Sequence, residues 1–127
     1  MATVEVTEEN FAATVQKGIV VLDFWAGWCG PCRAFAPVFE AAAERHPEVV
    51  FGKIDTEAQP ALAATFQIRS IPTLMIIRDG VLLARQAGSV SGATLDRIVE
   101  EVTALDMEEI RRHVDEDGGG AAANDDA

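Results

Sequence analysis

The chain contains only two cysteines, and they lie three positions apart in the segment Trp28-Cys29-Gly30-Pro31-Cys32. Residues three apart on a helix lie side by side, with Cβ atoms about 5–6 Å apart, and a disulfide needs Cα atoms about 4.4–6.8 Å apart. A helix that begins near Cys29 therefore lets the pair switch between two thiols and a disulfide with little backbone movement. Pro31 fits the first turn because it lacks only an N–H group that has no helical partner there. At this helix N-terminus the unpaired N–H groups and the dipole favour a thiolate at Cys29, the form that attacks disulfides.

The segment before the cysteines is apolar and predicts a buried strand. Residues 19–25 form a short, nearly continuous apolar run, which is typical of a strand in a parallel sheet. Asp23 is the one acidic residue in this run, and Ala26-Gly27 lead from it into the cysteine turn. We therefore expect a strand, a tight turn and a helix that carries both sulfurs.

The rest of the pattern predicts an α/β protein with the order β-α-β-α and then β-α-β-β-α. The expected strands are residues 2–6, 19–25, 49–55, 73–78 and 81–86, and the expected helices are 10–17, 29–45, 60–66 and one that starts after Ser91. Asp79-Gly80 is a hairpin signal between the last two strands. Crossover helices give parallel strands and the hairpin gives antiparallel ones, so the sheet is a mixed, central, five-stranded one flanked by about four helices.

A length of 127 residues fits one domain followed by a short extension. We assign residues 1–105 to the domain. Asp106 then resembles a helix N-cap, so residues 106–114 are expected to form an extra C-terminal helix. Residues 115–127 are acidic and Gly/Ala-rich, and we expect them to be disordered. The segment 106–127 holds eight acidic and two basic residues, which is about half of the net charge of −11. Solvation is the favoured role of this tail, ahead of binding a basic partner.

Composition excludes several classes of function. The net charge of −11 argues against a nucleic-acid partner. No apolar run approaches the roughly 18 residues of a membrane span. The first residues lack the basic and apolar regions of a secretory signal, which favours the cytoplasm. In such a reducing compartment, a close cysteine pair is catalytic or metal-binding rather than structural.

The strand, the Trp-Cys-Gly-Pro-Cys turn and the helix together resemble the thioredoxin family, as do the segment Ile68–Thr73 and Gly88 further on. The resemblance covers Thr3 to Leu105. It implies the thioredoxin fold and a monomeric protein disulfide reductase that binds no cofactor itself. Electrons would come from NADPH, indirectly, through a flavin-dependent thioredoxin reductase. The clients would be proteins that form a disulfide in each turnover, such as peroxiredoxins and other reductases.

The two cysteines and two charged residues are the candidate catalytic residues. Cys29 attacks the substrate disulfide, and Cys32 then resolves the mixed disulfide, which leaves a redox-active Cys29–Cys32 disulfide. In the family, the acid that matches Asp23 serves the buried cysteine as a proton shuttle, and a lysine that matches Lys53 modulates it. Burial raises the pKa of a lone carboxyl, which suits that role. The residues alone leave a second interpretation open, in which Asp23 is a structural acid paired with Lys53.

The resemblance also supplies the candidate substrate-binding residues. They should form a flat, mostly apolar patch around Cys29, made of Trp28, Gly30, Pro31, Ile71, Pro72 and Gly88. Ile71 would offer backbone groups to an extended substrate. The sequence alone favours a trans peptide bond before Pro72. The resemblance implies a cis bond at that position.

Three alternatives remain at this point. The cysteines could be half of a zinc site, although His46 and His113 are not in ligand spacing and are expected in solvent. A thiol oxidase or isomerase has the same fold, although Gly-Pro between the cysteines resembles the reducing members. A binding subunit or chaperone would use the apolar patch and not the thiols.

Overall fold

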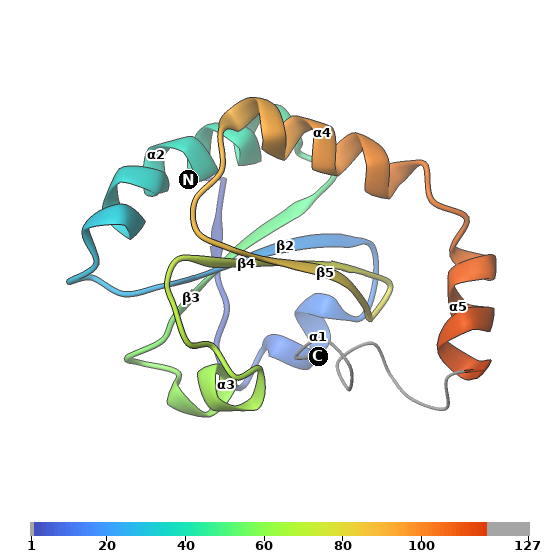
Figure 1. The fold of residues 1–127 in the computed structure, drawn as a ribbon, viewed down its shortest axis with the longest axis horizontal. Helices are drawn as coiled ribbons and strands as arrows, with labels where there is room; N and C mark the ends of the chain where they lie inside the picture. Colours follow the sequence, from blue (N-terminus) through green and yellow to red (C-terminus); the bar gives the residue numbers. More distant parts are fainter. Residues whose placement is uncertain (1, 117–127) are drawn as a thin grey trace.

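A five-stranded sheet is the centre of the computed structural model, which describes residues 2–116. Its spatial order is β1-β3-β2-β4-β5 (Figure 1). The strands are β1 (Val4–Glu5), β2 (Ile19–Trp25), β3 (Val50–Asp55), β4 (Thr73–Arg78) and β5 (Val81–Ala87). The helices are α1 (Phe11–Val15), α2 (Gly30–Arg45), α3 (Pro60–Thr65), α4 (Gly92–Thr103) and α5 (Met107–Glu116). This is the predicted element order, and the fold class is confirmed.

Strand β2 lies at the centre of the sheet and has one parallel and one antiparallel neighbour. It is parallel to β3, which is reached through the crossover helix α2, and antiparallel to β4. The β4–β5 hairpin turns at Asp79 and Gly80, whose φ angles are +52° and +82°. Positive φ at both central residues is the requirement of a type I′ turn, so the Asp-Gly signal predicted this hairpin correctly.

Helices cover both faces of the sheet (Figure 1). Because side chains alternate along a strand, Val21 of β2 faces α2 and α4, whereas its neighbours Val20 and Leu22 face α1 and α3. Each face has its own core. Phe35, Phe39 and Phe51 are fully buried in the first, and Phe24 and Ile54 in the second. Asp23 shares the α2 side of β2 with Val21.

The short N-terminal elements differ from the prediction. β1 covers only Val4–Glu5, and α1 begins at Phe11 rather than at residue 10. Thr7 and Asn10 exchange hydrogen bonds: the backbone N–H of each donates to the other's side-chain oxygen. The residues between them form turns before the helix begins.

The end of helix α2 is tied to α4 by a side-chain cluster. His46, which we expected in solvent, is half-buried, and its Nε2 lies 2.7 Å from Asp96 Oδ1. Arg45 also bonds Asp96 from 2.9 Å. These hydrogen bonds, led by that of His46, hold the pKa of Asp96 below its usual range. The expectation for His46 was wrong because its partner lies 50 residues away in the sequence.

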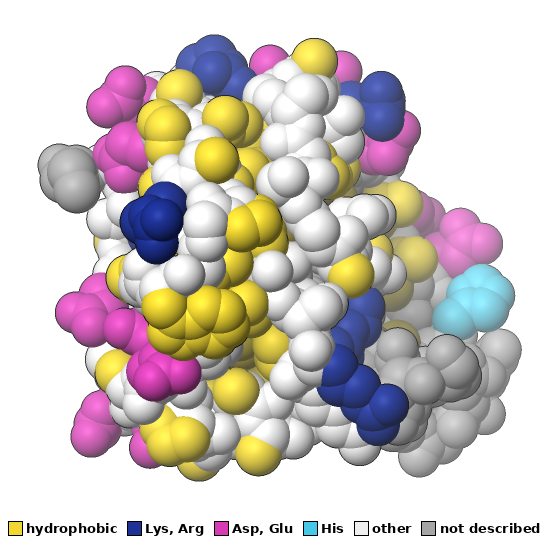
Figure 2. All heavy atoms as spheres, turned by 60° about the vertical axis from the view of Figure 1, so that its left-hand side comes forward, with side chains coloured by type: hydrophobic (Ala, Val, Ile, Leu, Met, Phe, Trp, Pro, Cys, Tyr) yellow, Lys and Arg dark blue, Asp and Glu magenta, His cyan; other side chains and the backbone are white. Residues whose placement is uncertain are grey.

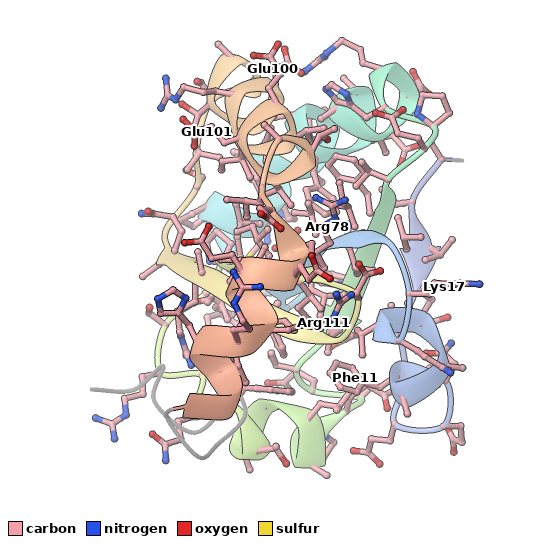
Figure 3. All side chains as sticks on the ribbon, turned by 90° about the vertical axis from the view of Figure 1, so that its right-hand side faces the viewer. Phe11, Lys17, Arg78, Glu100, Glu101 and Arg111 are labelled. Atoms are coloured by element: carbon pink, nitrogen blue, oxygen red, sulfur yellow. A yellow bond between two sulfur atoms is a disulfide. The ribbon has the colours of Figure 1, made fainter. Side chains whose placement is uncertain are left out.

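Helix α5 packs at the end of the sheet that carries the β4–β5 turn (Figure 3). Met107 is buried at its start, and Arg111 pairs with Asp79 at 3.4 Å. Below the junction with α4, Arg78 Nη1 donates to the carbonyl oxygens of Val102, Thr103 and Leu105. The helix ends at Glu116, two residues later than predicted. The rest of the predicted disordered tail lies outside the described residues.

Candidate active site

The two cysteines lie after the last residue of β2, at the start of α2, and at the end of the sheet where the parallel strands β2 and β3 finish. Figure 2 shows this side of the molecule, where apolar side chains gather between acidic and basic ones. Trp28 is 69% exposed, which is unusual for so large an apolar side chain. A surface with this composition is typical of a contact site for other proteins.

Cys29 and Cys32 are joined in a disulfide, with their Cα atoms 5.2 Å apart. Cys29 is the N-cap residue of α2, and the backbone N–H of Cys32 donates to its Sγ from 3.1 Å. Both residues are almost completely buried, with 4% and 2% of their surface exposed. The helical spacing predicted from the sequence is confirmed. An N–H donor aimed at Cys29 Sγ, together with the helix dipole, stabilises negative charge on that sulfur.

The loop before β4 packs against the disulfide. Ile71 is half-buried in the same cluster as the two cysteines, and its carbonyl oxygen lies 3.7 Å from Cys29 Sγ. The Ile71–Pro72 peptide bond is cis. The resemblance implied this bond, and the trans bond favoured by the sequence alone was wrong. Gly88 N donates to Pro72 O from 2.8 Å, and such a distant partner is invisible in local sequence.

Two glycines lie next to these segments: Gly88 is hydrogen-bonded to the loop through Pro72, and Gly30 follows Cys29 in the cysteine turn. Gly88 has φ +90°, which L side chains rarely adopt, so glycine fits there. A Cβ added to Gly30 would meet nothing within 4 Å, so the space beside Cys29 is open. Pro31 is exposed next to it.

Asp23 lies on β2, six residues before Cys29 in the chain, and is only 1% exposed. Neither of its carboxylate oxygens has a hydrogen-bond partner among the described residues. Burial raises its pKa from the ordinary value of 3.8 to about 7, and the charge of Lys53 lowers it in part. Lys53 is the register partner of Asp23 on β3, yet no ion pair within 4 Å joins them in the described part of the chain. The Lys53 Nζ instead lies 4.6 Å from the centre of the Trp25 ring.

A groove of about 190 Å³ runs beside the disulfide. Its lining includes Trp28 and residues 68–71 of the segment in which the resemblance placed the substrate-binding loop, together with Thr56 and Ala63, which the sequence did not predict. Glu57 was also missed, and its carboxylate accepts a hydrogen bond from Trp28 Nε1 at 3.1 Å. The sequence did carry a signal for Thr56 and Glu57. They follow β3, and the carboxyl ends of neighbouring parallel strands meet at one edge of a sheet.

Comparison with known proteins decides the family. The thioredoxin family model matches residues 2–103. The chain belongs to the thioredoxin family. A "Putative thioredoxin 2" of Streptomyces coelicolor is 53% identical over 116 residues, which is 91% of this chain and 87% of that protein. The thioredoxin of Mycobacterium bovis is 41% identical over 80% of this chain and 90% of its own length. That of Chlamydia trachomatis is 38% identical over 76% and 94%.

As a thioredoxin, the chain is a thiol–disulfide oxidoreductase that acts by dithiol–disulfide exchange through Cys29-Gly30-Pro31-Cys32. In this family, thioredoxin reductase generally reduces the disulfide again after each exchange. Residues 2–116 include no helix with the length and apolar character of a membrane span. Within the same residues, no three His, Cys, Asp or Glu side chains come together as a metal site.

Proposed function

We propose that this thioredoxin is a reductase of protein disulfides in which Cys29 is the attacking and Cys32 the resolving cysteine. The observation that carries the assignment is the cap geometry: Cys29 Sγ receives the Cys32 N–H at 3.1 Å at the start of α2. A sulfur held in this position is stabilised as a thiolate. Cys32 lies one turn into the helix and is the less exposed of the two.

The reaction proceeds in two exchanges. The Cys29 thiolate attacks one sulfur of the client disulfide, the client S–S bond breaks, and the other client sulfur leaves as a thiolate. Cys32 loses its proton and attacks Cys29 Sγ, which breaks the mixed disulfide and releases the second client thiolate. Two electrons pass from the protein dithiol to the client, and the Cys29–Cys32 disulfide remains.

Asp23 is the proposed base for the Cys32 thiol, and Lys53 the proposed modulator of that base. A carboxyl whose pKa is about 7 can both take and return a proton near neutral pH. The competing interpretation, a structural ion pair between these residues, lacks support because neither Asp23 oxygen is bonded to Lys53.

The apolar patch is the proposed docking surface for clients. Trp28, Gly30 and Pro31 belong to the cysteine turn, and Ile71 packs in the same cluster as the two cysteines. Pro72 follows Ile71 in the chain, and its carbonyl oxygen accepts a hydrogen bond from Gly88 N. The Ile71 carbonyl and the open space at Gly30 support a client chain that lies extended across the disulfide.

The electrons come from NADPH through a flavin-dependent reductase, and the clients are proteins that form a disulfide in each turnover. We place the protein in the cytoplasm, where thiols are kept reduced, as a monomer with no nucleic-acid or membrane partner. Residues 1–105 are the proposed exchange domain, and the extension after Leu105 takes no part in the exchange step.

An insulin-reduction assay with NADPH and thioredoxin reductase tests the proposal. We expect turnover in the native protein and none in Cys29→Ser. Cys32→Ser should instead accumulate a mixed disulfide with the client, visible by mass spectrometry after thiol trapping. A Cys29→Ser variant that still reduces insulin, or a Cys32→Ser variant that traps nothing, would contradict the assignment.

The oxidase alternative needs a separate measurement. Equilibration of the Cys29–Cys32 pair with dithiothreitol buffers gives its reduction potential. A reductase should equilibrate in the range of strongly reducing dithiols. A reduction potential close to that of strong protein oxidants would show that the protein is a thiol oxidase of the same fold and not a reductase.

A further inference from the structure

Three side chains of neighbouring strands meet on the sheet face beneath α2. Asp23 and Trp25 are two residues apart on β2 and therefore point to the same side. Lys53 stands opposite Asp23 in the register of β3. The ammonium of Lys53 can thus reach either the carboxylate of Asp23 or the ring of Trp25.

In the structure Lys53 contacts Trp25. Its Nζ lies 4.6 Å from the ring centre, within the roughly 6 Å of a cation–π interaction. Asp23, which is 1% exposed, keeps both oxygens without a hydrogen-bond partner among the described residues. If the Lys53 ammonium and the Asp23 carboxylate came together in so buried a place, they would attract each other strongly. A contact that takes the ammonium away from the carboxylate therefore has a direct chemical consequence.

We infer that Trp25 is a positioning residue for the proton-transfer step: its ring holds the Lys53 ammonium and thereby leaves the Asp23 carboxyl unpaired. This inference rests on the proposed role of Asp23 as the base for Cys32. If Lys53 turned to Asp23, the ion pair would favour the ionised carboxylate and lower its pKa. A carboxylate with a lower pKa is a weaker base for the thiol of Cys32.

The other charged groups around Lys53 act in the same direction as Trp25. Glu5 and Asp55 line a hollow of about 260 Å³ together with Trp25 and Lys53. Their carboxylates attract the ammonium toward solvent and away from Asp23. Asp55 is itself fixed, because its Oδ1 accepts hydrogen bonds from the backbone N–H groups of Glu57 and Ala58. On the α2 side lie the two cysteine sulfurs, which share a cluster with Trp25, and Glu40, whose carboxylate accepts a hydrogen bond from the hydroxyl of Thr3, a residue that lines the same hollow.

The test is the pKa of Asp23, measured in the oxidised protein by carbon-13 NMR of labelled carboxyl groups. The variants are Trp25→Leu, which removes the aromatic ring, and Trp25→Phe, which keeps a weaker one. We expect Trp25→Leu to lower the pKa of Asp23 by about one pH unit or more, and Trp25→Phe to lower it less. The apparent pKa of mixed-disulfide resolution should fall by the same amount, and the rate above that pKa should fall with it.

A matched background separates the cation from simple packing. In Lys53→Met the ammonium is absent, so adding Trp25→Leu should hardly change the pKa of Asp23. Glu5→Gln controls for the hollow and should shift it much less than Trp25→Leu does. The inference is overturned if Trp25→Leu leaves the pKa unchanged, raises it, or shifts it equally with and without Lys53.

A second measurement covers the case in which Trp25→Leu does not fold. Fluorinated tryptophan at position 25, in a Trp28→Phe background, weakens the ring's attraction for a cation while keeping its shape. The pKa of Asp23 should then fall with each added fluorine, and a constant pKa would refute the inference. None of these titrations requires activity. A failure of the proposed role of Asp23, shown by unchanged turnover in Asp23→Asn, is therefore a separate result.

Discussion

Asp23 destabilises the fold in the pH range in which the protein would work. Its pKa is about 7 in the folded state and about 3.8 when exposed, so the folded protein binds the proton more tightly. Stability therefore falls as the pH rises from about 4 to about 7, and the full cost is present above pH 7. The shift corresponds to at most about 4 kcal/mol.

We predict that Asp23→Asn unfolds at higher denaturant concentration than the native protein at pH 8, by up to about 4 kcal/mol of unfolding free energy. The gain should shrink toward pH 4, close to the pKa of Asp23 in the unfolded state, because below that pH the carboxyl is protonated in both states. The same variant should resolve mixed disulfides more slowly at pH 7. Urea titrations of the oxidised proteins at pH 4, 6 and 8 check the first part, and a gain that does not depend on pH would contradict it.

Gly52 is a residue at which the packing itself excludes a side chain. A Cβ there would lie 2.6 Å from Val6 Cγ2 and 3.0 Å from Leu22 Cδ2, and both neighbours are fully buried. We predict that Gly52→Ala lowers the unfolding free energy by about 1–3 kcal/mol. Gly30→Ala is the matched control for stability, since a Cβ at that position meets nothing within 4 Å. Equal unfolding midpoints for the two variants would refute the packing argument.

At the residue scale, the sequence located the chemistry but not every orientation. The cysteines and Asp23 could be predicted because a CxxC turn and an acid inside an apolar strand are local patterns. The contact of Lys53 with Trp25 could not, because a lysine on β3 has two partners within reach and only packing selects one. The bonds of Glu57 to Trp28 and of His46 to Asp96 likewise join residues 29 and 50 positions apart.

The element order could be read from the sequence because the periodicity changes clearly between strands and helices. β4 has the predicted bounds, Thr73–Arg78, and α2 ends at Arg45 as predicted. The larger errors fall on β1, α1 and α5, which are short elements with few buried residues. Their ends depend on tertiary contacts such as the pair of Arg111 with Asp79 rather than on local preference.

Helix α5 lies at the end of the sheet opposite the start of α2, where the disulfide is (Figure 1). Met107 is its buried anchor, with 7% of its surface exposed. We predict that Met107→Ala costs about 2 kcal/mol of stability and leaves the rate of insulin reduction within twofold of the native rate. Glu108→Ala, at an exposed neighbouring position, should change neither. A loss of activity in Met107→Ala at a temperature where it remains folded would show that α5 acts on the site.

On the scale of the whole molecule, excess negative charge opposes compactness. The chain has 21 acidic and 10 basic residues, and its net charge is −11. The exposed ion pairs that act in the other direction, Arg45–Asp96 and Arg111–Asp79, are worth at most about 1 kcal/mol each. Repulsion summed over the surface should therefore exceed these pairs.

We predict that salt stabilises this protein. Raising the ionic strength from 0.01 to 0.1 M shortens the screening length from about 30 to about 10 Å, which weakens the summed repulsion more than it weakens the few close pairs. The urea midpoint at pH 7.5 should rise while the slope of the transition stays constant. Glu100 and Glu101 are exposed on the last turn of α4, where a negative charge also opposes the helix dipole (Figure 3). Replacing both with Gln reduces the excess negative charge from −11 to −9, so this variant should be more stable than the native protein at 0.01 M and gain less from added salt. If the native midpoint falls as salt is added, the local ion pairs dominate and the argument from net charge is wrong.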